Sequence, residues 1–226
     1  FRAGDALTIT AGLRSDRYDD VGSSTTPRLA AVWQMMPGHL VKAQYAEAFR
    51  APTFYEQRFG SDIKPETITT REVGYVFKTA GSHAAITVFD STLKHPVVLD
   101  ESIPVYLNYA QDSQSRGVEL EAEHWLTSRV KVDGNLSLIR TNDHATGKPI
   151  PGGASRLLNL GAGWNAGKDA ALDGRLRHVG PRHREQTDSR GKLASYTTVD
   201  VTAKLFNLGY RGLTVRGCLT TPARSK

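Results

Sequence analysis

Hydrophobic and polar residues alternate along most of the chain with a period of two residues. The clearest run is Val-Glu-Leu-Glu-Ala-Glu at 118–123. Successive side chains of a β-strand point to opposite faces, so this pattern predicts strands with one apolar and one polar face. The 3.6-residue period of an amphipathic helix barely occurs, and the chain is therefore predicted to be all-β.

The same alternation predicts about eleven strands of roughly ten residues each, joined by turns and loops that differ in length. The expected strands cover 5–18, 27–35, 40–49, 67–79, 83–93, 117–126, 130–141, 156–165, 171–180, 195–206 and a last one from about 212. Short turns are expected at 36–39, 79–82, 127–129, 166–169 and 207–211, and long loops at 19–26, 50–66, 94–116, 142–155 and 181–194. In antiparallel up-and-down order, all the long loops lie at one end of the sheet. Because roughly ten residues cross a bilayer as a tilted strand, a transmembrane β-barrel is favoured over a soluble β-sandwich or propeller.

The composition agrees with a barrel and argues against nucleic acid as a binding partner. No run of about 18 apolar residues occurs, which excludes a transmembrane helix, whereas barrel strands are only weakly hydrophobic on average. The 29 Lys and Arg residues exceed the 23 Asp and Glu residues by six. These cations are dispersed along the chain, so nucleic acid is not an expected partner. The single cysteine, Cys218, allows neither an internal disulfide nor a Cys-based zinc cluster, and no cofactor is expected.

Six short segments occur in an order that points to a known family. They are PRL at 27–29, FRAPTFYE at 49–56, IKPE at 63–66, REVGY at 71–75, NYA followed by RGVELE between 108 and 121, and YTTVD at 196–200. Each segment alone is weakly specific, but together they span most of the chain. In this order they resemble the motifs of TonB-dependent outer-membrane receptors. The resemblance implies a 22-stranded barrel, of which this chain would supply about eleven strands, so that the barrel is incomplete.

The resemblance also implies a function. Such receptors import scarce ligands such as ferric siderophores, haem or cobalamin, driven by TonB through an N-terminal plug that no segment of this chain resembles. We expect a Gram-negative outer-membrane location, contact with membrane lipid and lipopolysaccharide, and a ferric siderophore or similar iron chelate as ligand. Haem and cobalamin stay open as alternatives. A barrel protease or lipase and a soluble β-rich adhesin are the competing classes, but an enzyme is not expected because the motifs favour a receptor.

Candidate ligand-binding residues lie in the expected loops. They are Arg50, Arg58, Tyr106, His144, Arg182 and His183. Arg50 and Pro52 are expected mainly to redirect the chain from strand to loop, because proline cannot donate to a ladder. Arg182 and His183 belong to a basic cluster that would attract an anionic chelate or contact lipopolysaccharide phosphates; its other members are Arg175, His178, Arg184, Arg190 and Lys192. The histidines lack metal-site spacing such as HExxH, and no metal site is expected.

The alternation also assigns faces. Glu119, Glu121 and Glu123 share one face and are expected to line the polar lumen rather than to form a metal or proton site. The side chains expected to face the lumen with them are Asn135, Lys42 and Gln44, and those expected to face lipid are Leu120, Val132, Leu136, Leu158, Leu160, Val199 and Val201.

Residues 217–226 depart from the family pattern. The family usually ends in a strand with a terminal aromatic residue, whereas here Pro222 lacks a ladder donor and no aromatic residue follows. We therefore expect one partial barrel domain over 1–226, with 217–226 as an atypical tail of a truncated or frame-shifted product. Its sheet would have unpaired edges at about 5–18 and 213–220. Lipid does not tolerate such edges, so this polypeptide alone is expected to aggregate or be degraded.

Overall fold

The computed structural model describes residues 2–4, 6–19, 22–60, 62–100, 103–185 and 188–224. Its one helix in these ranges is α1 (Phe54–Arg58). The strands are β1 (Arg2–Ala3), β2 (Leu7–Tyr18), β3 (Gly22–Met36), β4 (His39–Arg50), β5 (Glu66–Lys78), β6 (Ser82–Lys94), β7 (Val97–Asp100), β8 (Val105–Asn108), β9 (Ser113–Trp125), β10 (Val130–Asp143), β11 (Arg156–Asn165), β12 (Ala170–Val179), β13 (Tyr196–Phe206) and β14 (Thr214–Arg224).

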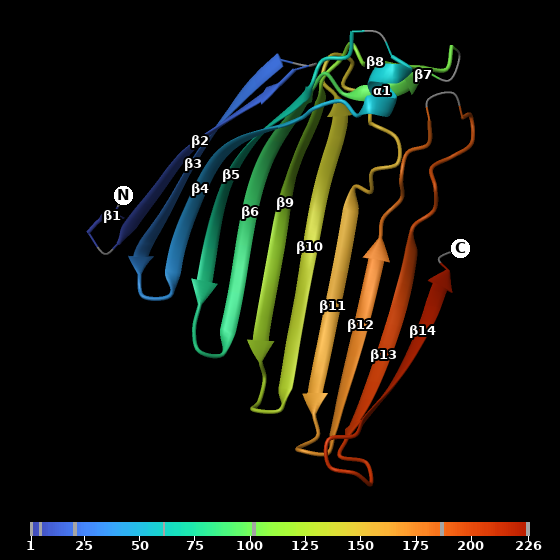
Figure 1. Ribbon diagram of the computed structural model, residues 1–226. Coiled ribbons are helices and arrows are strands. Elements are labelled where there is room, and N and C mark those ends of the chain that lie inside the picture. The colour runs from blue at the N-terminus through green and yellow to red at the C-terminus, as the bar shows by residue number, and fades with distance from the viewer. Residues whose placement is uncertain are drawn as a thin grey trace. The chain divides into compact units, whose positions relative to one another are not determined.

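The strands form one large sheet in chain order (Figure 1). Its order is β1-β2-β3-β4-β5-β6-β9-β10-β11-β12-β13-β14, and β7 and β8 form a separate two-stranded hairpin. Sequence neighbours are therefore spatial neighbours, which confirms the predicted antiparallel up-and-down sheet. Within the described ranges β1 and β14 end the order, so the sheet is not closed.

The chain divides into two compact units. The first unit comprises Phe1–Tyr75, Val88–Gly117 and Arg140–Ile150, and the second comprises Val76–Thr87, Val118–Ile139 and Pro151–Lys226. The first unit thus contains β1 to β4, α1, β7 and β8, and β5, β6, β9 and β10 each have residues in both units. The second contains β11 to β14 and the turns that join β5 to β6 and β9 to β10.

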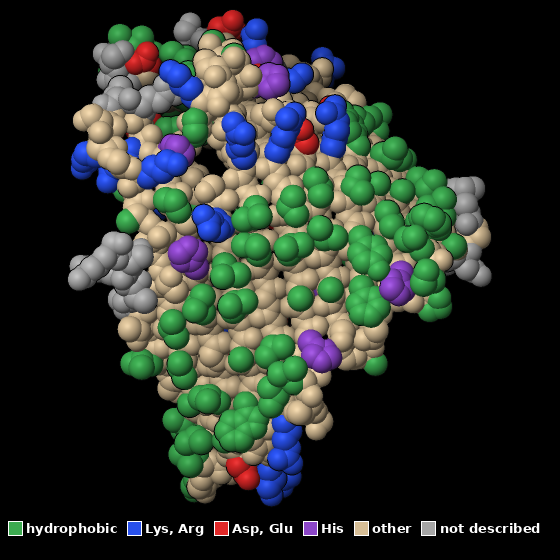
Figure 2. All heavy atoms as spheres, turned by 180° about the vertical axis from the view of Figure 1, so that it is seen from behind, with side chains coloured by type: hydrophobic (Ala, Val, Ile, Leu, Met, Phe, Trp, Pro, Cys, Tyr) green, Lys and Arg blue, Asp and Glu red, His purple; other side chains and the backbone are tan. Residues whose placement is uncertain are grey.

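In the second unit, strand register separates the two faces as predicted. Leu136 pairs with Leu158, and Leu160 with Leu176, so apolar side chains follow one another on one face. On the other face, the Asn159 Nδ2 donates to the side-chain oxygen of Asn135 over 2.7 Å. The apolar face is not packed under a second layer: of the described hydrophobic residues, only Val76 is buried. Hydrophobic side chains are spread over much of the face shown in Figure 2.

The first unit has the same division of faces. Leu29 pairs with Ala11 on one side and Tyr45 on the other, which places all three on one face. Lys42 and Gln44 lie on the opposite face of β4, as predicted. The tight turn at 36–39 is also present, with Gly38 at a φ of +79° that glycine adopts without strain.

Three sequence predictions about loops and strand ends were wrong. The expected loop at 19–26 is a short connection, because β3 already begins at Gly22 and pairs there with Tyr18. Ser and Thr at 23–26 continue the strand, and the Ser15 and Thr25 hydroxyls lie 3.2 Å apart across it. The segment 94–116 is not only loop, since it contains β7 and β8. β14 also continues past Pro222, which pairs with Thr198; a proline is tolerated in a terminal strand if its nitrogen points away from the ladder.

Candidate functional site

The connection between β4 and β5 carries the helix α1, which begins with a capping box. The Thr53 hydroxyl accepts a hydrogen bond from the Glu56 amide over 3.2 Å, and the Glu56 carboxylate accepts from the Thr53 amide over 2.6 Å. These reciprocal bonds satisfy two backbone donors that a helix otherwise leaves unpaired. The sequence T-F-Y-E at 53–56 is the signal that predicts this start, whereas hydrophobic periodicity does not reveal it because five residues are too short to show a period.

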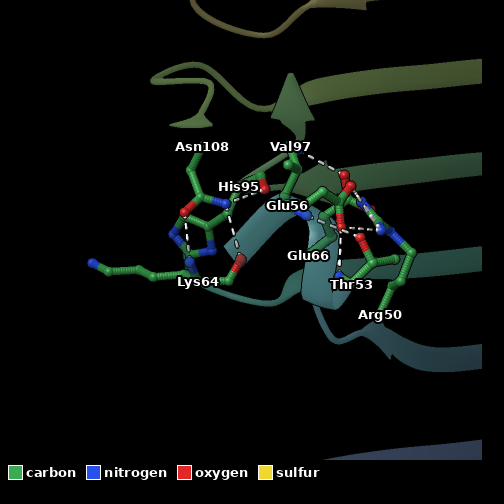
Figure 3. A network of polar contacts seen from close by, with 8 residues as sticks. All are labelled: Arg50, Thr53, Glu56, Lys64, Glu66, His95, Val97 and Asn108. Atoms are coloured by element: carbon green, nitrogen blue, oxygen red, sulfur yellow. Dashed lines mark hydrogen bonds and ion pairs between the residues drawn. The ribbon is translucent and has the colours of Figure 1, made fainter. Parts of the chain in front are cut away.

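Arg50, at the end of β4, is the centre of a charged network (Figure 3). Its Nε donates to Glu66 at 2.6 Å, and its two Nη groups donate to both carboxylate oxygens of Glu56 at 3.0–3.1 Å. The other Glu66 oxygen accepts from the Val97 amide at 2.7 Å. One arginine therefore connects β4, α1, β5 and the start of β7. Its predicted structural role fits this geometry, and bidentate pairing of this kind is specific to a guanidinium.

We call the layer formed by Arg50, α1, residues 63–66 and the β7–β8 hairpin the loop layer. Asn108, at the end of β8, holds another part of it. Its side-chain oxygen accepts from the Lys64 amide at 2.6 Å, and its Nδ2 donates to the carbonyls of Lys64 and His95 at 2.9 and 2.8 Å (Figure 3). A single amide side chain thus holds two loop segments that lie far apart in the sequence. The NYA motif at 108–110 therefore has a structural explanation at its first residue.

Aromatic rings cover the exposed side of this layer. The Tyr55 ring lies 4.7 Å from the Phe59 ring and 5.8 Å from the Tyr106 ring, measured between centroids. Phe54 is 87% exposed and Tyr55 is 62% exposed. Gly60 permits the close approach of β8, because a Cβ there would stand 2.7 Å from the Tyr106 carbonyl oxygen and 2.6 Å from that of Glu56.

The structure brings three of the six predicted ligand-binding residues together. Arg50, Arg58 and Tyr106 all belong to the loop layer of the first unit, and the Arg58 side chain is exposed in the last turn of α1. His144 is exposed in the same unit, where its amide donates to the Asp112 carbonyl at 2.8 Å. The sequence prediction missed the exposed rings of Phe54, Tyr55 and Phe59 as candidate ligand contacts. Phe54 and Tyr55 lie within the FRAPTFYE motif, and Phe59 follows it by three residues.

Arg182 and His183 belong to the second unit. The backbone of Arg182 bridges to Ala154 and to Leu193, and the Arg182 Nε is one of the buried side-chain atoms of the described residues that lack a hydrogen-bond partner. The basic cluster is less basic than its sequence suggests. Asp188 pairs with Arg190 at 2.7 Å and with Arg184 at 3.5 Å, and the hydrogen bonds from Arg190 hold the pKa of the Asp188 carboxyl below its ordinary value.

Two other members of the predicted basic cluster lie within β12 and face opposite sides of it. Arg175 pairs with Asp133 on the polar face, and the His178 ring contacts the Thr197 hydroxyl at 2.9 Å on the other face. Side chains an odd number of residues apart on a strand cannot share a face. The sequence prediction of one cluster around a single loop was therefore wrong for these two residues.

The three glutamates of β9 lie on the polar face. Glu123 pairs with Lys131 at 2.8 Å, Glu121 lies 3.8 Å from a nitrogen of the His83 ring, and the Ser137 hydroxyl donates to Glu119 at 3.4 Å. Each carboxylate has a partner on a neighbouring strand. Across the described ranges, no three His, Cys, Asp or Glu side chains gather closely enough to hold a metal ion. No helix in those ranges has the length and apolar character needed to span a membrane.

Comparison with known proteins identifies the family. Residues 1–217 match the family described as TonB dependent receptor-like, beta-barrel. The chain belongs to this family. As a member of this family the chain is part of an outer-membrane β-barrel. The family match favours the receptor class over the barrel protease or lipase alternative.

The relatives of this receptor barrel differ in what their names say they bind. A vitamin B12 transporter of Vibrio cholerae is 29% identical over 162 residues, covering 70% of this chain and 26% of the relative. A metal-pseudopaline receptor of Pseudomonas aeruginosa is 27% identical over 214 residues, covering 84% of this chain and 29% of the relative. The chain thus spans about a quarter of the length of these curated relatives, at 26% and 29%.

Solved structures confirm the barrel fold of the receptor. The FrpB iron transporter from Neisseria meningitidis has a TM-score of 0.76 at 20% identity, covering 96% of this chain and 38% of that protein. A mutant of the ferric enterobactin receptor from Pseudomonas aeruginosa has a TM-score of 0.77 at 19% identity, covering 89% of this chain and 35% of that protein. At these identities the likeness establishes the fold alone.

Acid should loosen the loop layer through Glu56. The hydrogen bonds from Arg50 hold the pKa of the Glu56 carboxyl below its ordinary value of 4.5. A carboxyl whose pKa is lowered by folding stabilises the folded loop above the ordinary pKa, and this contribution is lost as the pH falls through the lowered value. We expect hydrogen exchange of the α1 amides, corrected for its intrinsic pH dependence, to accelerate below about pH 4.5. A Glu56→Gln variant should show a smaller acceleration, because only Glu66 then still titrates beside Arg50. An identical profile in both proteins would contradict the assignment.

Proposed function

We propose that the receptor containing this chain takes up a ferric siderophore or a similar iron chelate, and that the loop layer of the first unit makes contact with it. The observation that carries this proposal is the surface formed by Phe54, Tyr55 and Phe59 beside the exposed Arg58. Aromatic faces and a guanidinium together suit a ligand that is partly aromatic and negatively charged, because rings stack and the cation attracts the anion. Many iron chelates have this chemistry.

Two further parts of the proposal concern the whole receptor. We infer that TonB drives uptake through a plug domain outside these residues, as the family implies. We also infer that Glu119, Glu121 and Glu123 line the lumen. Their pairing with Ser137, His83 and Lys131 supports a polar wall, because a barrel interior is polar and its carboxylates are neutralised by neighbouring strands.

A corrinoid is the second candidate ligand. The observation that favours it is the 29% identity to the vitamin B12 transporter of Vibrio cholerae over 70% of this chain. A corrinoid is larger and less anionic than most iron chelates, so it would depend less on Arg58 and more on the rings. The two candidates therefore predict different losses of affinity when the charge of Arg58 is removed.

The proposal is tested by titrating the full-length receptor with a ligand panel. The panel contains a ferric catecholate, a ferric hydroxamate, haem and cyanocobalamin, and binding is followed by quenching of intrinsic fluorescence. We expect an iron chelate to bind, and Tyr55→Ala and Arg58→Gln each to weaken it about three- to tenfold, the usual range for one exposed ring or cation contact.

Tyr210 provides a control, because it is also an exposed tyrosine, at 80%, and lies in the short turn between β13 and β14. Tyr210→Ala should leave affinity unchanged. Binding of cyanocobalamin with no binding of any iron chelate would show that the siderophore assignment is wrong.

A further inference from the structure

A row of charged side chains crosses the apolar face of the sheet in the first unit. We call it the arginine row, and it consists of Arg71 on β5, Asp90 on β6, Arg116 on β9 and Arg140 on β10. Figure 2 shows Lys and Arg side chains with an acidic side chain among them, next to the hydrophobic part of this face. Charged groups on a lipid-facing surface are costly and call for an explanation.

Side-chain contacts on the opposite face place the four residues in two neighbouring pairs, and the ion pair between Arg116 and Asp90 joins the pairs. The Thr70 and Ser91 hydroxyls lie 3.0 Å apart, and the Ser115 and Thr141 hydroxyls also lie 3.0 Å apart. In antiparallel strands, the residue after one member of such a pair stands beside the residue before the other. Arg71 therefore stands beside Asp90, and Arg116 beside Arg140.

The row has more positive than negative charge. Arg116 Nε pairs with Asp90 at 2.7 Å, and this single carboxylate stands between two arginines. Arg140 Nε donates to the side-chain oxygen of Asn142 at 2.9 Å in the amide orientation that satisfies both groups, which adds no negative charge. Like charges on directly opposite strand positions are destabilising, so Arg116 beside Arg140 would be stabilised by an anion.

The position of the row along the strands suggests the anion. On β5, Arg71 is followed at two-residue steps by the exposed side chains of Val73 and Tyr75, and on the other side its guanidinium lies 5.9 Å from the centre of the Tyr45 ring. The row thus stands where the apolar part of the face ends, on the side of the strands that leads into the loop layer. In an outer-membrane barrel this boundary meets lipid headgroups, where aromatic and basic side chains gather.

We propose that the arginine row binds the phosphate group of a lipid headgroup in the outer leaflet. Guanidinium groups bind phosphate through paired N–H donors. Arg116 donates to Asp90 through its Nε, and its side chain is 64% exposed. The proposal rests on the outer-membrane location of the barrel and is independent of which ligand the receptor transports.

The test measures lipid binding to the full-length receptor in detergent by native mass spectrometry. The probes are bisphosphorylated lipid A, the same lipid after enzymatic removal of its phosphates, and inorganic phosphate. We expect the phosphorylated lipid to bind most tightly, and Arg140→Gln or Arg116→Gln to weaken it about fivefold each, the effect typical of one basic residue at an anionic lipid surface. Asp90→Asn should instead tighten binding, because it removes the only carboxylate of the row.

Arg129→Gln is the matched control, since Arg129 is exposed in the short turn between β9 and β10. Heat-modifiable migration on gels identifies the variants that fold. Asp90→Asn tests the charge of the row without removing an arginine. Equal binding of both lipids, or an unchanged affinity in all row variants, would overturn the proposal. Inorganic phosphate that binds as tightly as the lipid would show a free-anion site and would overturn the assignment to a headgroup.

Discussion

Replacing Leu160 by arginine should lower the free energy of unfolding of the receptor by about 2–4 kcal/mol, the cost of a basic side chain near the middle of the lipid face of a barrel. Leu160 is the fifth residue of the ten-residue strand β11 and is 47% exposed. It lies between Gly134 and Leu176 on the neighbouring strands. A guanidinium there would have to lie in hydrocarbon or displace lipid to reach water.

The measurement is a urea titration of the full-length receptor in lipid vesicles. Ser137→Arg serves as the control, because it adds the same charge to the polar face of β10, beside Glu119. That change should lower the free energy of unfolding much less, since the new guanidinium can pair with Glu119 and remain hydrated. Equal costs at the two positions would show that the face containing Leu160 is not in contact with lipid.

The faces and most strand bounds could be predicted because they depend only on the order of side chains within a strand. The 118–123 run assigns its glutamates and apolar residues to opposite faces without any knowledge of a partner strand. The strand expected at 156–165 has these bounds in the structure. The up-and-down order could also be predicted, because strands joined by short turns pair as antiparallel neighbours in the sheet.

Errors occurred where polar residues adopt regular structure. Ser and Thr at 23–26 look like loop residues but pair as strand, because β-branched Thr suits a pleated backbone and hydroxyls bond across the pair. The helix α1 is too short for a periodic signal, and only its capping box identifies it.

The arginine row could not be predicted, because it depends on the register between strands. Consecutive members of the row, which are Arg71, Asp90, Arg116 and Arg140, are 19, 26 and 24 residues apart in the sequence. Their alignment follows only from pairs such as Ser115 with Thr141, and a slip of one residue would turn one member to the other face. The loop layer has the same limitation, since Asn108 reaches Lys64 and His95 only after the strands have formed.

Arg50→Ala should open the loop layer without unfolding the barrel. The change removes the hydrogen bonds from Arg50 to Glu56 and Glu66 and leaves two carboxylates, whose side chains are only 13% and 15% exposed, without their cation. The Arg50 side chain itself is 44% exposed, so water screens part of the interaction. We therefore expect a local loss of about 1–2 kcal/mol rather than the larger cost of a fully buried pair.

Hydrogen exchange of the Val97 amide is the sharpest measurement of this opening, because that amide donates to Glu66 and is held in place through Arg50. A loss of about 1–2 kcal/mol corresponds to exchange about five- to thirtyfold faster at Val97 and in α1. Arg50→Lys should recover only part of the protection, since an ammonium group cannot reproduce the paired bonds to Glu56. Arg58→Ala, which removes an exposed cation from the same helix, should leave this exchange unchanged even though we expect Arg58 to contribute to ligand binding. If Arg50→Ala and Arg58→Ala had the same effect on hydrogen exchange, Arg50 would not be the residue that holds the loop layer together.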